Sequence, residues 1–399
     1  MMSSQKILFF DAAASGHHAE YFENLIAGFT DKQAERSILV VHPALVESLA
    51  SSKQAGNSPI SIQCMTSAEI DYMMTAKNIV QVGCRQLEVL ERYIEKFEAS
   101  SVCLMHINLH QYALGGWQPK RAVKIAGILF NPYTPARRSF GIKAKLLARI
   151  TALRKRIQFW LMLRNLSIYK IYLLNDERMN NLLNSWYPSR RVFATLVDPL
   201  PAALGETLPI VNKGKEVYTF LLAGSMTARK GCLETLEAFR TLMPQCTQQV
   251  ELRLVGRFRS DSQDYKAKVS EKIDILNEEC PQLSVELVDE HVSFETLDRE
   301  FAKADCILAP YLDFYGSSGV LGHACRHEKP MITCRNGLVG ELVTSMEIGL
   351  TIEPGDALAF VKALHRLIKN ELLYDVETAR DYCRSANHVE FASTLIRGL

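Results

Sequence analysis

One stretch in the second half of the chain has the composition of an anion-binding turn. An apolar strand is predicted over Cys306 to Ala309, and a helical pattern begins at Val320. The small residues before that helix are Gly316, Ser317, Ser318 and Gly319. Free backbone amides at the start of a helix can bind a diphosphate where small residues let it approach. Gly and Ser also form ordinary turns, so this stretch alone leaves both interpretations open.

Two cations follow an earlier strand in a comparable position. The strand predicted over Val217 to Ala223 ends in Gly224 and Ser225. Arg229 and Lys230 come next, where an amphipathic helix is predicted to begin. The helix dipole disfavours cations there unless an anion is bound nearby. We therefore expect both side chains to face a phosphate, and the alternative is a solvated cationic surface.

Polar or small residues also follow three strands predicted in the first half. They are Gly16 and His17 after Ile7 to Phe10, His106 and His110 after Val102 to Met105, and Asn131 after Ile125 to Phe130. Ligands of doubly wound sheets bind beyond the carboxyl ends of the strands, which makes these residues candidates for a site. A single His is more often a hydrogen-bonded structural residue, and that alternative stays open.

Strands and helices alternate along the whole chain, which predicts parallel sheets in an α/β fold. A length of 399 residues with 48% apolar and 23% charged residues suits a globular protein of two or three domains. The segment 199–216 is rich in Pro and Gly and lacks a clear period, so we interpret it as a linker between domains.

In this order, the features of residues 217 to 370 resemble the nucleotide-sugar-binding domain of the retaining family-4 glycosyltransferases. The second strand of this half, Glu251 to Val255, ends in Gly256 and Arg257. The resemblance implies the GT-B architecture, with two Rossmann-like doubly wound domains facing a cleft. It implies an N-terminal acceptor-side domain over 1–198, a donor-binding domain over 217–375 and a C-terminal segment, 376–399, that packs back on the first domain.

The resemblance assigns roles to individual residues. In that family an Arg and a Lys hold the donor diphosphate; Lys230 matches the Lys, Ser225 stands in place of the Arg, and Arg229 is its substitute. Asn131 stands where a His contacts the donor sugar. A pair of Glu is replaced by Tyr315 and His323, and the second of these Glu binds the ribose. The implied donor site is Gly16, His17, Gly224, Ser225, Arg229, Lys230, Gly256, Arg257, Tyr315, Gly316, Ser317, Ser318, Gly319, Val320 and His323, and the implied catalytic residues are His106, His110, Asn131, Arg229 and Lys230.

The expected activity is transfer of a sugar from a nucleotide-diphosphate sugar to a glycan or lipid-linked acceptor, as in surface polysaccharide or glycolipid assembly. The family implies a retaining, hexosyltransferase-like enzyme. We expect no metal and no cofactor, because two cations can stabilise the leaving diphosphate. The alternatives are a non-catalytic nucleotide-sugar-binding protein of a polysaccharide assembly complex and a GT-B sugar-nucleotide epimerase.

The middle of the chain is strongly basic. No Asp or Glu occurs from Ala99 to Asn175, and the segment Lys143 to Leu166 mixes Lys and Arg with Leu, Ile and Trp. This composition is typical of a helix that lies on an anionic membrane, and a basic helix packed on the sheet is the alternative. No nucleic-acid-binding motif accompanies the charge.

Ten scattered Cys without a C-x-x-C pair suit a reducing compartment. No run of 18 apolar residues occurs, so we expect a cytoplasmic protein with peripheral contact to the inner membrane face.

Overall fold

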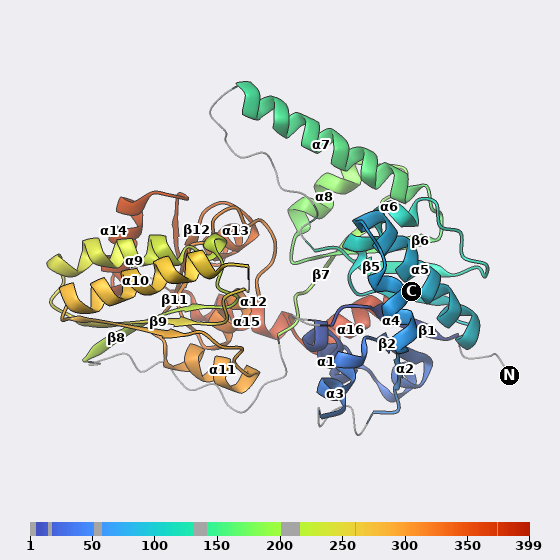
Figure 1. Ribbon diagram of the computed structural model, residues 1–399, viewed down its shortest axis with the longest axis horizontal. Helices are drawn as coiled ribbons and strands as arrows, with labels where there is room; N and C mark the ends of the chain where they lie inside the picture. The colour runs from blue at the N-terminus through green and yellow to red at the C-terminus, as the bar shows by residue number, and fades with distance from the viewer. Residues whose placement is uncertain are drawn as a thin grey trace. The chain divides into compact units, whose positions relative to one another are not determined.

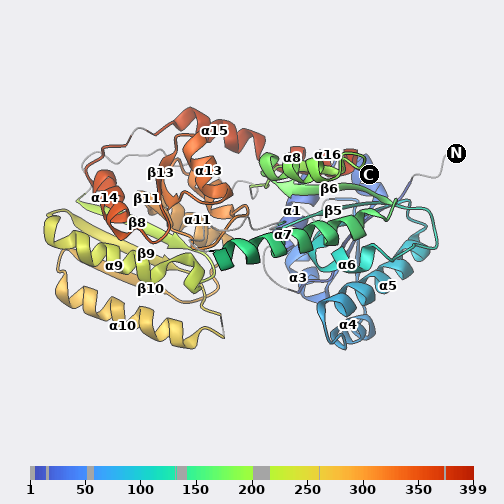
Figure 2. The ribbon, with the colours of Figure 1, turned by 90° about the horizontal axis from the view of Figure 1, so that it is seen from above.

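The computed structural model describes residues 5–14, 18–51, 58–130, 132, 142–200, 216–259, 261–372 and 374–399. The chain folds into two compact units. The first is Met1–Ala202 with Ala386–Leu399, and the second is Ala203–Ser385. Each unit is built around one parallel sheet (Figures 1 and 2), which confirms the predicted α/β class. The predicted linker falls mostly on 201–215, outside the described residues.

The first unit contains a seven-stranded sheet in the order β3-β2-β1-β4-β5-β6-β7. Every neighbouring pair is parallel, and β1 pairs with both β2 and β4. The chain order reverses between β1 and β4, where ligand sites occur in doubly wound sheets. The strands are β1 Ile7–Asp11, β2 Ser37–Val41, β3 Ser61–Cys64, β4 Ser101–Leu104, β5 Lys124–Ile128, β6 Ile168–Leu174 and β7 Phe193–Leu196.

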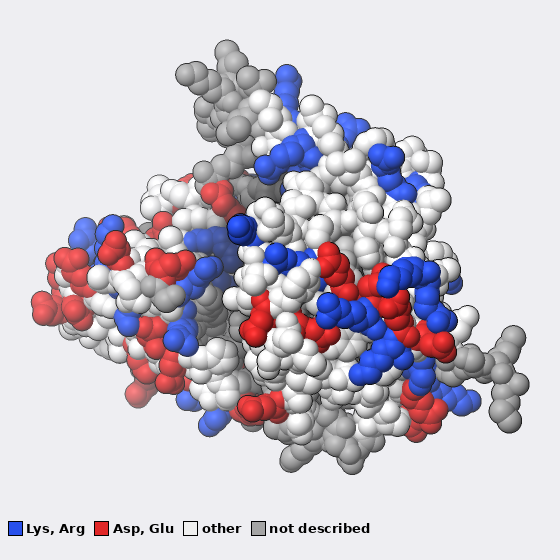
Figure 3. Space-filling view, turned by 45° about the vertical axis from the view of Figure 1, so that its right-hand side comes forward, with Lys and Arg blue, Asp and Glu red and all other residues white. Residues whose placement is uncertain are grey.

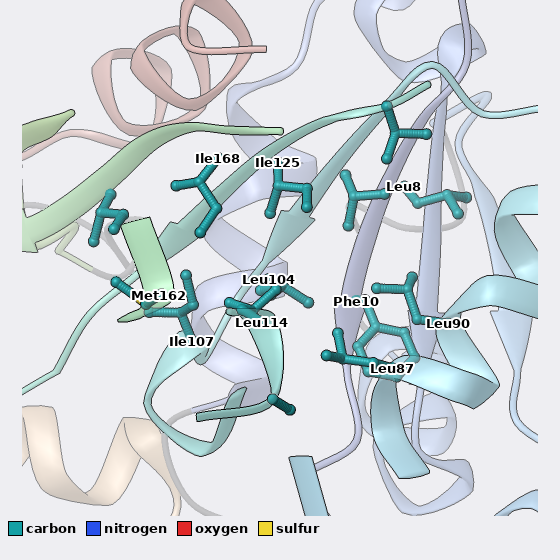
Figure 4. Close-up of a cluster of buried hydrophobic side chains, with 14 of the residues drawn as sticks. Leu8, Phe10, Leu87, Leu90, Leu104, Ile107, Leu114, Ile125, Met162 and Ile168 are labelled. Atoms are coloured by element: carbon teal, nitrogen blue, oxygen red, sulfur yellow. The ribbon is translucent and has the colours of Figure 1, made fainter. Parts of the chain in front are cut away.

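Helices pack on both faces of this sheet and bury one apolar core on each face. One core joins strand residues such as Leu8 and Leu104 to Leu87 and Leu90 of α5 (Figure 4). The Asn78 side chain accepts from the Gln81 amide at the start of α5, satisfying a backbone donor that the helix leaves unpaired. The helices are α1 His18–Gly28, α2 Asp31–Arg36, α3 Pro43–Ser51, α4 Ser67–Met74, α5 Ile79–Phe97, α6 Gln111–Leu114, α7 Ile142–Leu163, α8 Glu177–Trp186 and α16 His388–Arg397.

The second unit contains a six-stranded parallel sheet in the order β10-β9-β8-β11-β12-β13. Its chain order reverses between β8 and β11, the counterpart of the reversal in the first unit. The strands are β8 Val217–Ala223, β9 Gln249–Val255, β10 Leu283–Val288, β11 Cys306–Ala309, β12 Met331–Cys334 and β13 Gly349–Ile352. The helices are α9 Cys232–Leu242, α10 Gln263–Glu279, α11 Phe294–Lys303, α12 Gly319–Arg326, α13 Leu338–Ser345, α14 Ala357–Ile368 and α15 Val376–Ser385.

The final two helices are divided between the units. Helix α16 packs on α1, where a Cβ on Gly28 would lie 2.0 Å from the His388 carbonyl oxygen. The Tyr172 hydroxyl of β6 donates to the Thr394 carbonyl at 2.9 Å. Helix α15 instead packs on α12 of the second unit. Of the segment 376–399, only the part from Ala386 onward is therefore grouped with the first unit.

Candidate functional site

Two glycine turns lie against each other at the carboxyl edge of the second sheet. Gly224 follows β8 with φ 110°, and Gly256 follows β9 with φ 141°, conformations that favour glycine. A Cβ on Gly256 would lie 2.1 Å from the Gly224 carbonyl oxygen, so no larger residue fits there. The Met226 amide donates to the Arg257 carbonyl at 2.9 Å, which fixes the two turns together. Gly224 itself is half-buried and follows β8, one of the two strands at which the chain order reverses.

Lys230 brings a buried ammonium to this edge. The residue is 9% exposed, and its Nζ donates to the Tyr311 hydroxyl at 2.7 Å. A Cβ on Gly224 would lie 3.1 Å from this Nζ, so the ammonium lies beside the turn after β8. Among the described residues, no carboxylate forms an ion pair with Lys230. A buried cation is costly without an anionic partner, so this position suits a bound anion.

Arg229 and Lys230 lie in a short 3-10 turn, Ala228–Lys230, rather than at the helix start. Gly231 closes the turn with φ 76°, and α9 begins at Cys232. The predicted helix start at Arg229 is therefore three residues early. Both side chains face the segment after β11: the guanidinium of Arg229 lies 4.6 Å from the centre of the Phe314 ring, whereas Ser225 is exposed beside the turn.

The predicted anion-binding turn lies at the same edge of the sheet. The Tyr311 hydroxyl is 3.4 Å from Ser318 Oγ, so Lys230, Tyr311 and Ser318 form a continuous polar row. Ser318 precedes α12 in an extended conformation, and its side chain makes no capping bond. Gly319 begins α12 and is exposed, and a Cβ on it would meet no described atom within 4 Å. Gly316 is buried, and Ser317 and Val320 are both half-buried.

His323, in the second turn of α12, is buried against aromatic rings. It is 7% exposed, and its ring stacks on Phe301 with centroids 4.7 Å apart. The Phe294 ring lies 5.6 Å away on a second side. Tyr315 is partly buried in the segment before the turn. The aromatic packing gives His323 a structural role, and its contact with a ribose stays a prediction.

In the first unit, the residues after β4 form a histidine cluster. His110 is buried and its Nδ1 lies 3.2 Å from the His106 carbonyl oxygen. Burial lowers the pKa of His110 to about 4, and it also lowers the pKa of His106. The His110 Nε2 has no hydrogen-bond partner among the described residues. Both imidazoles are thus held neutral at pH 7.

A hydrogen bond at the end of β1 was not predicted from the sequence. Asp11, the last residue of β1, is 5% exposed, and its Oδ2 lies 2.6 Å from Nδ1 of His18. The His18 ring centroid is 5.5 Å from that of His106, so the pair adjoins the histidine cluster. The available signal is the His-His sequence at 17–18 after the first strand, which predicts both residues at the ligand-binding edge of the sheet and includes His17 in the donor site.

Three predicted site residues, Gly16, His17 and Asn131, lie outside the described residues. Within the described ranges, no group of three or more His, Cys, Asp or Glu is arranged to hold a metal ion. Also within these ranges, no helix is both long enough and apolar enough to cross a membrane.

Most of the sequence of the second unit matches a known family. Residues 217–370 match the family described as Glycosyl transferases group 1. The match begins at the first residue of β8 and includes both glycine turns, Lys230 and the turn before α12. The comparison with curated proteins found no match to the chain.

Solved glycosyltransferase structures resemble the chain over nearly its whole length. The apo lipopolysaccharide outer core galactosyltransferase WaaB is 11% identical, with 99% of each chain covered and a TM-score of 0.63. Anabaena Alr3699/HepE in complex with UDP is 14% identical, with 98% of this chain and 99% of that chain covered and a TM-score of 0.63. Sucrose-phosphate synthase from Thermosynechococcus elongatus is 15% identical, with 98% of each chain covered and a TM-score of 0.66. At these identities the likeness establishes the GT-B fold and nothing finer.

Proposed function

We propose that the protein is a glycosyltransferase that uses a nucleotide-diphosphate sugar as donor. The observation that carries the proposal is the buried Lys230 ammonium, which lies beside the Gly224 turn with no described carboxylate paired to it. This position falls inside the segment that matches the glycosyltransferase family. HepE is described in complex with UDP, and we extend that ligand class to this chain.

In this proposal the second unit binds the donor and stabilises its departure. Lys230 and Arg229 face the diphosphate, and the backbone amides at the start of α12 contact its distal phosphate or the sugar. As the glycosidic bond breaks, negative charge develops on the diphosphate, and fixed cations and amides lower the energy of that state without reorganising. The residues in place of the family's Glu pair are Tyr315 and His323. We propose that the donor sugar is a hexose and that its anomeric configuration is retained, as in the retaining family-4 glycosyltransferases that the sequence resembles. NMR of the anomeric product would test the stereochemistry.

A nucleotide screen by thermal shift tests the donor site. A ligand at 100 times its dissociation constant raises the free energy of unfolding by about 2.7 kcal/mol. We expect at least one of UDP, GDP, ADP and dTDP to stabilise the protein, and no stabilisation by any of them would contradict the proposal. Slow hydrolysis of the matching nucleotide sugar would then favour the enzyme, whereas binding without any turnover would favour the non-catalytic alternative.

We further propose that α7 brings the first unit to an anionic membrane carrying the acceptor. Phe159, Met162 and Leu163 of α7 are buried against the sheet. The opposite face exposes an apolar stripe at helical spacing: Ile150, Leu153, Ile157 and Trp160. Among the described residues near the top of Figure 3, where Figure 1 places α7, Lys and Arg side chains are visible and no Asp or Glu is. An apolar stripe flanked by cations suits the boundary between lipid headgroups and acyl chains.

A further inference from the structure

Two aromatic rings after β11 contact the two cations that follow β8. The Lys230 Nζ lies 4.0 Å from the centre of the Tyr311 ring, in addition to its 2.7 Å bond to the Tyr311 hydroxyl. The Arg229 guanidinium lies 4.6 Å from the centre of the Phe314 ring. The two rings meet edge to face with their centroids 5.3 Å apart. Each cation therefore has its own aromatic partner, and the two partners support each other.

The backbone of the aromatic segment is fixed to the turn that carries the cations. The Leu312 amide donates to the Arg229 carbonyl at 2.8 Å. A Cβ on Gly231, the residue that closes the turn, would lie 2.7 Å from the Pro310 carbonyl oxygen. The two segments are thus in close backbone contact, and all of these residues belong to the second unit. The rings and the cations are consequently placed relative to each other by one folded unit.

An aromatic face holds a cation in a different way from a carboxylate. The ring attracts the cation through its quadrupole and carries no net charge, so the cation keeps its full positive charge. A carboxylate would instead neutralise the cation and repel an incoming phosphate. Among the described residues, neither Arg229 nor Lys230 forms an ion pair with a carboxylate, whereas Arg335 and Arg384 of the same unit each do. The two cations after β8 are therefore fixed without being neutralised.

The contacts with the rings also restrict two long, flexible side chains. Lys and Arg lose rotamer freedom when they bind a ligand, and that loss lowers the affinity unless the side chains are already ordered. Tyr311 belongs to a buried apolar core and is 5% exposed, and the Phe314 ring packs against the same core. The bond to the Tyr311 hydroxyl uses one of the three donors of the Lys230 ammonium and leaves two for phosphate oxygens.

We propose that Tyr311 and Phe314 are positioning residues for the donor diphosphate; this inference rests on the proposed glycosyltransferase function. Tyr311 holds the Lys230 ammonium, and Phe314 holds the Arg229 guanidinium. The rings act through these two cations rather than on the diphosphate itself. They increase the affinity for the diphosphate because the cations are ordered before it binds and remain fully charged.

Calorimetric titration of the full-length protein tests this role. Tyr311→Phe keeps the ring and removes the hydroxyl, and Phe314→Leu removes the aromatic face at a half-buried position. With whichever of UDP, GDP, ADP and dTDP binds the parent, we expect each variant to bind about 2- to 10-fold more weakly and to bind the matching nucleoside as the parent does. Phe314→Tyr keeps an aromatic face and should retain the parent affinity. The control is Tyr218→Phe, at the amino end of β8, which should also bind as the parent does.

Double variants show whether the rings act through the cations. In an Arg229→Ala protein, Phe314→Leu should cause no further loss of diphosphate affinity, because the side chain that it positions is gone. In a Lys230→Ala protein, Tyr311→Phe should likewise cause none. Additive losses would overturn the inference, because each ring would then act independently of its cation. Equal losses for the diphosphate and the nucleoside would also overturn it, because they would indicate a general disturbance of the fold.

The outcomes separate this inference from the function on which it rests. A parent protein that binds none of the four nucleoside diphosphates would overturn the proposed function and this inference with it. A parent that binds one, with Tyr311→Phe and Phe314→Leu binding it equally well or more tightly, would overturn the positioning role alone. Because Phe314 is only half-buried, Phe314→Leu decides the result independently of how Tyr311→Phe folds.

Discussion

The ammonium of Lys230 lies 2.7 Å from the Tyr311 hydroxyl, although 81 positions separate the two residues along the chain. The contact joins the turn after β8 to the segment after β11, the two strands at which the chain order of the sheet reverses. It places a buried cation next to the small-residue turn that precedes α12. The donor site that we propose is built on this relationship.

The turn before α12 gives a prediction that separates ligand contact from folding. A side chain at Gly319 would meet open space, so Gly319→Val should leave the free energy of unfolding nearly unchanged. A branched side chain there should instead block the approach of a phosphate to the backbone, and nucleoside diphosphate binding should weaken severely by calorimetry. Ser317→Ala and Ser318→Ala should be mild, because the contacts are made by backbone amides. A Gly319→Val protein that binds as tightly as the parent would exclude this turn from the donor site.

His323 requires a variant that keeps its ring. Because the imidazole stacks on Phe301, His323→Ala should lower the free energy of unfolding by about 1 to 3 kcal/mol through lost packing. His323→Phe keeps an aromatic ring without a hydrogen-bonding group. If His323 contacts the ribose, His323→Phe should weaken nucleotide binding by about 1 to 2 kcal/mol and leave binding of inorganic diphosphate unchanged. Equal affinities of His323→Phe and the parent for nucleotides would confine His323 to packing.

The exposed stripe of α7 predicts binding to vesicles that contain phosphatidylserine and weaker binding to pure phosphatidylcholine. Binding should decrease with salt and with neutralisation of Arg154, Lys155 and Arg156, each worth about 1 kcal/mol near the surface. Lys155 should contribute least, because burial lowers its pKa. Trp160→Ser should weaken binding through the lost apolar contact.

The matched control for α7 neutralises two exposed cations of the second unit. Arg335 and Arg384 each form an ion pair with a carboxylate, so Arg335→Gln and Arg384→Gln should not alter vesicle binding. Sedimentation that is indifferent to lipid charge would argue that α7 only packs on the sheet.

Buried His110 predicts a dependence of stability on pH. Its pKa is about 4 in the folded protein and about 6.5 in an unfolded chain. Between these values the unfolded state binds more protons, so the free energy of unfolding should decrease as the pH falls from about 6.5 to about 4. The contribution is at most about 1.4 kcal/mol per pH unit. In His110→Gln the slope of urea-derived stability against pH should be smaller, and an unchanged slope would contradict this account.

The parts of the fold that depend on local pattern could be predicted from the sequence. Helix α5, Ile79–Phe97, is of this kind, because its apolar residues recur at the helical period. The face that a helix buries was harder to predict. In α7 the apolar residues occupy both sides of the helix, and only tertiary packing decides that Phe159 is buried and Trp160 exposed.

Contacts between distant segments were also beyond prediction. Periodicity reports neither the bond from Lys230 to Tyr311 nor the stacking of His323 on Phe301. The bond from Asp11 to His18 joins two residues seven positions apart that no local pattern brings together. These contacts depend on which strands become neighbours, and that is a property of the whole sheet.

The most direct measurement is calorimetric titration of the parent and Lys230→Ala with nucleoside diphosphates and with the matching nucleosides. Exposed Lys303 of α11 supplies the control, Lys303→Ala, which should bind as the parent does. If Lys230 holds the diphosphate, Lys230→Ala should weaken nucleoside diphosphate binding by about 1.5 to 3 kcal/mol and leave nucleoside binding nearly unchanged. Equal losses for both ligands, or no loss for either, would contradict a donor site at Lys230.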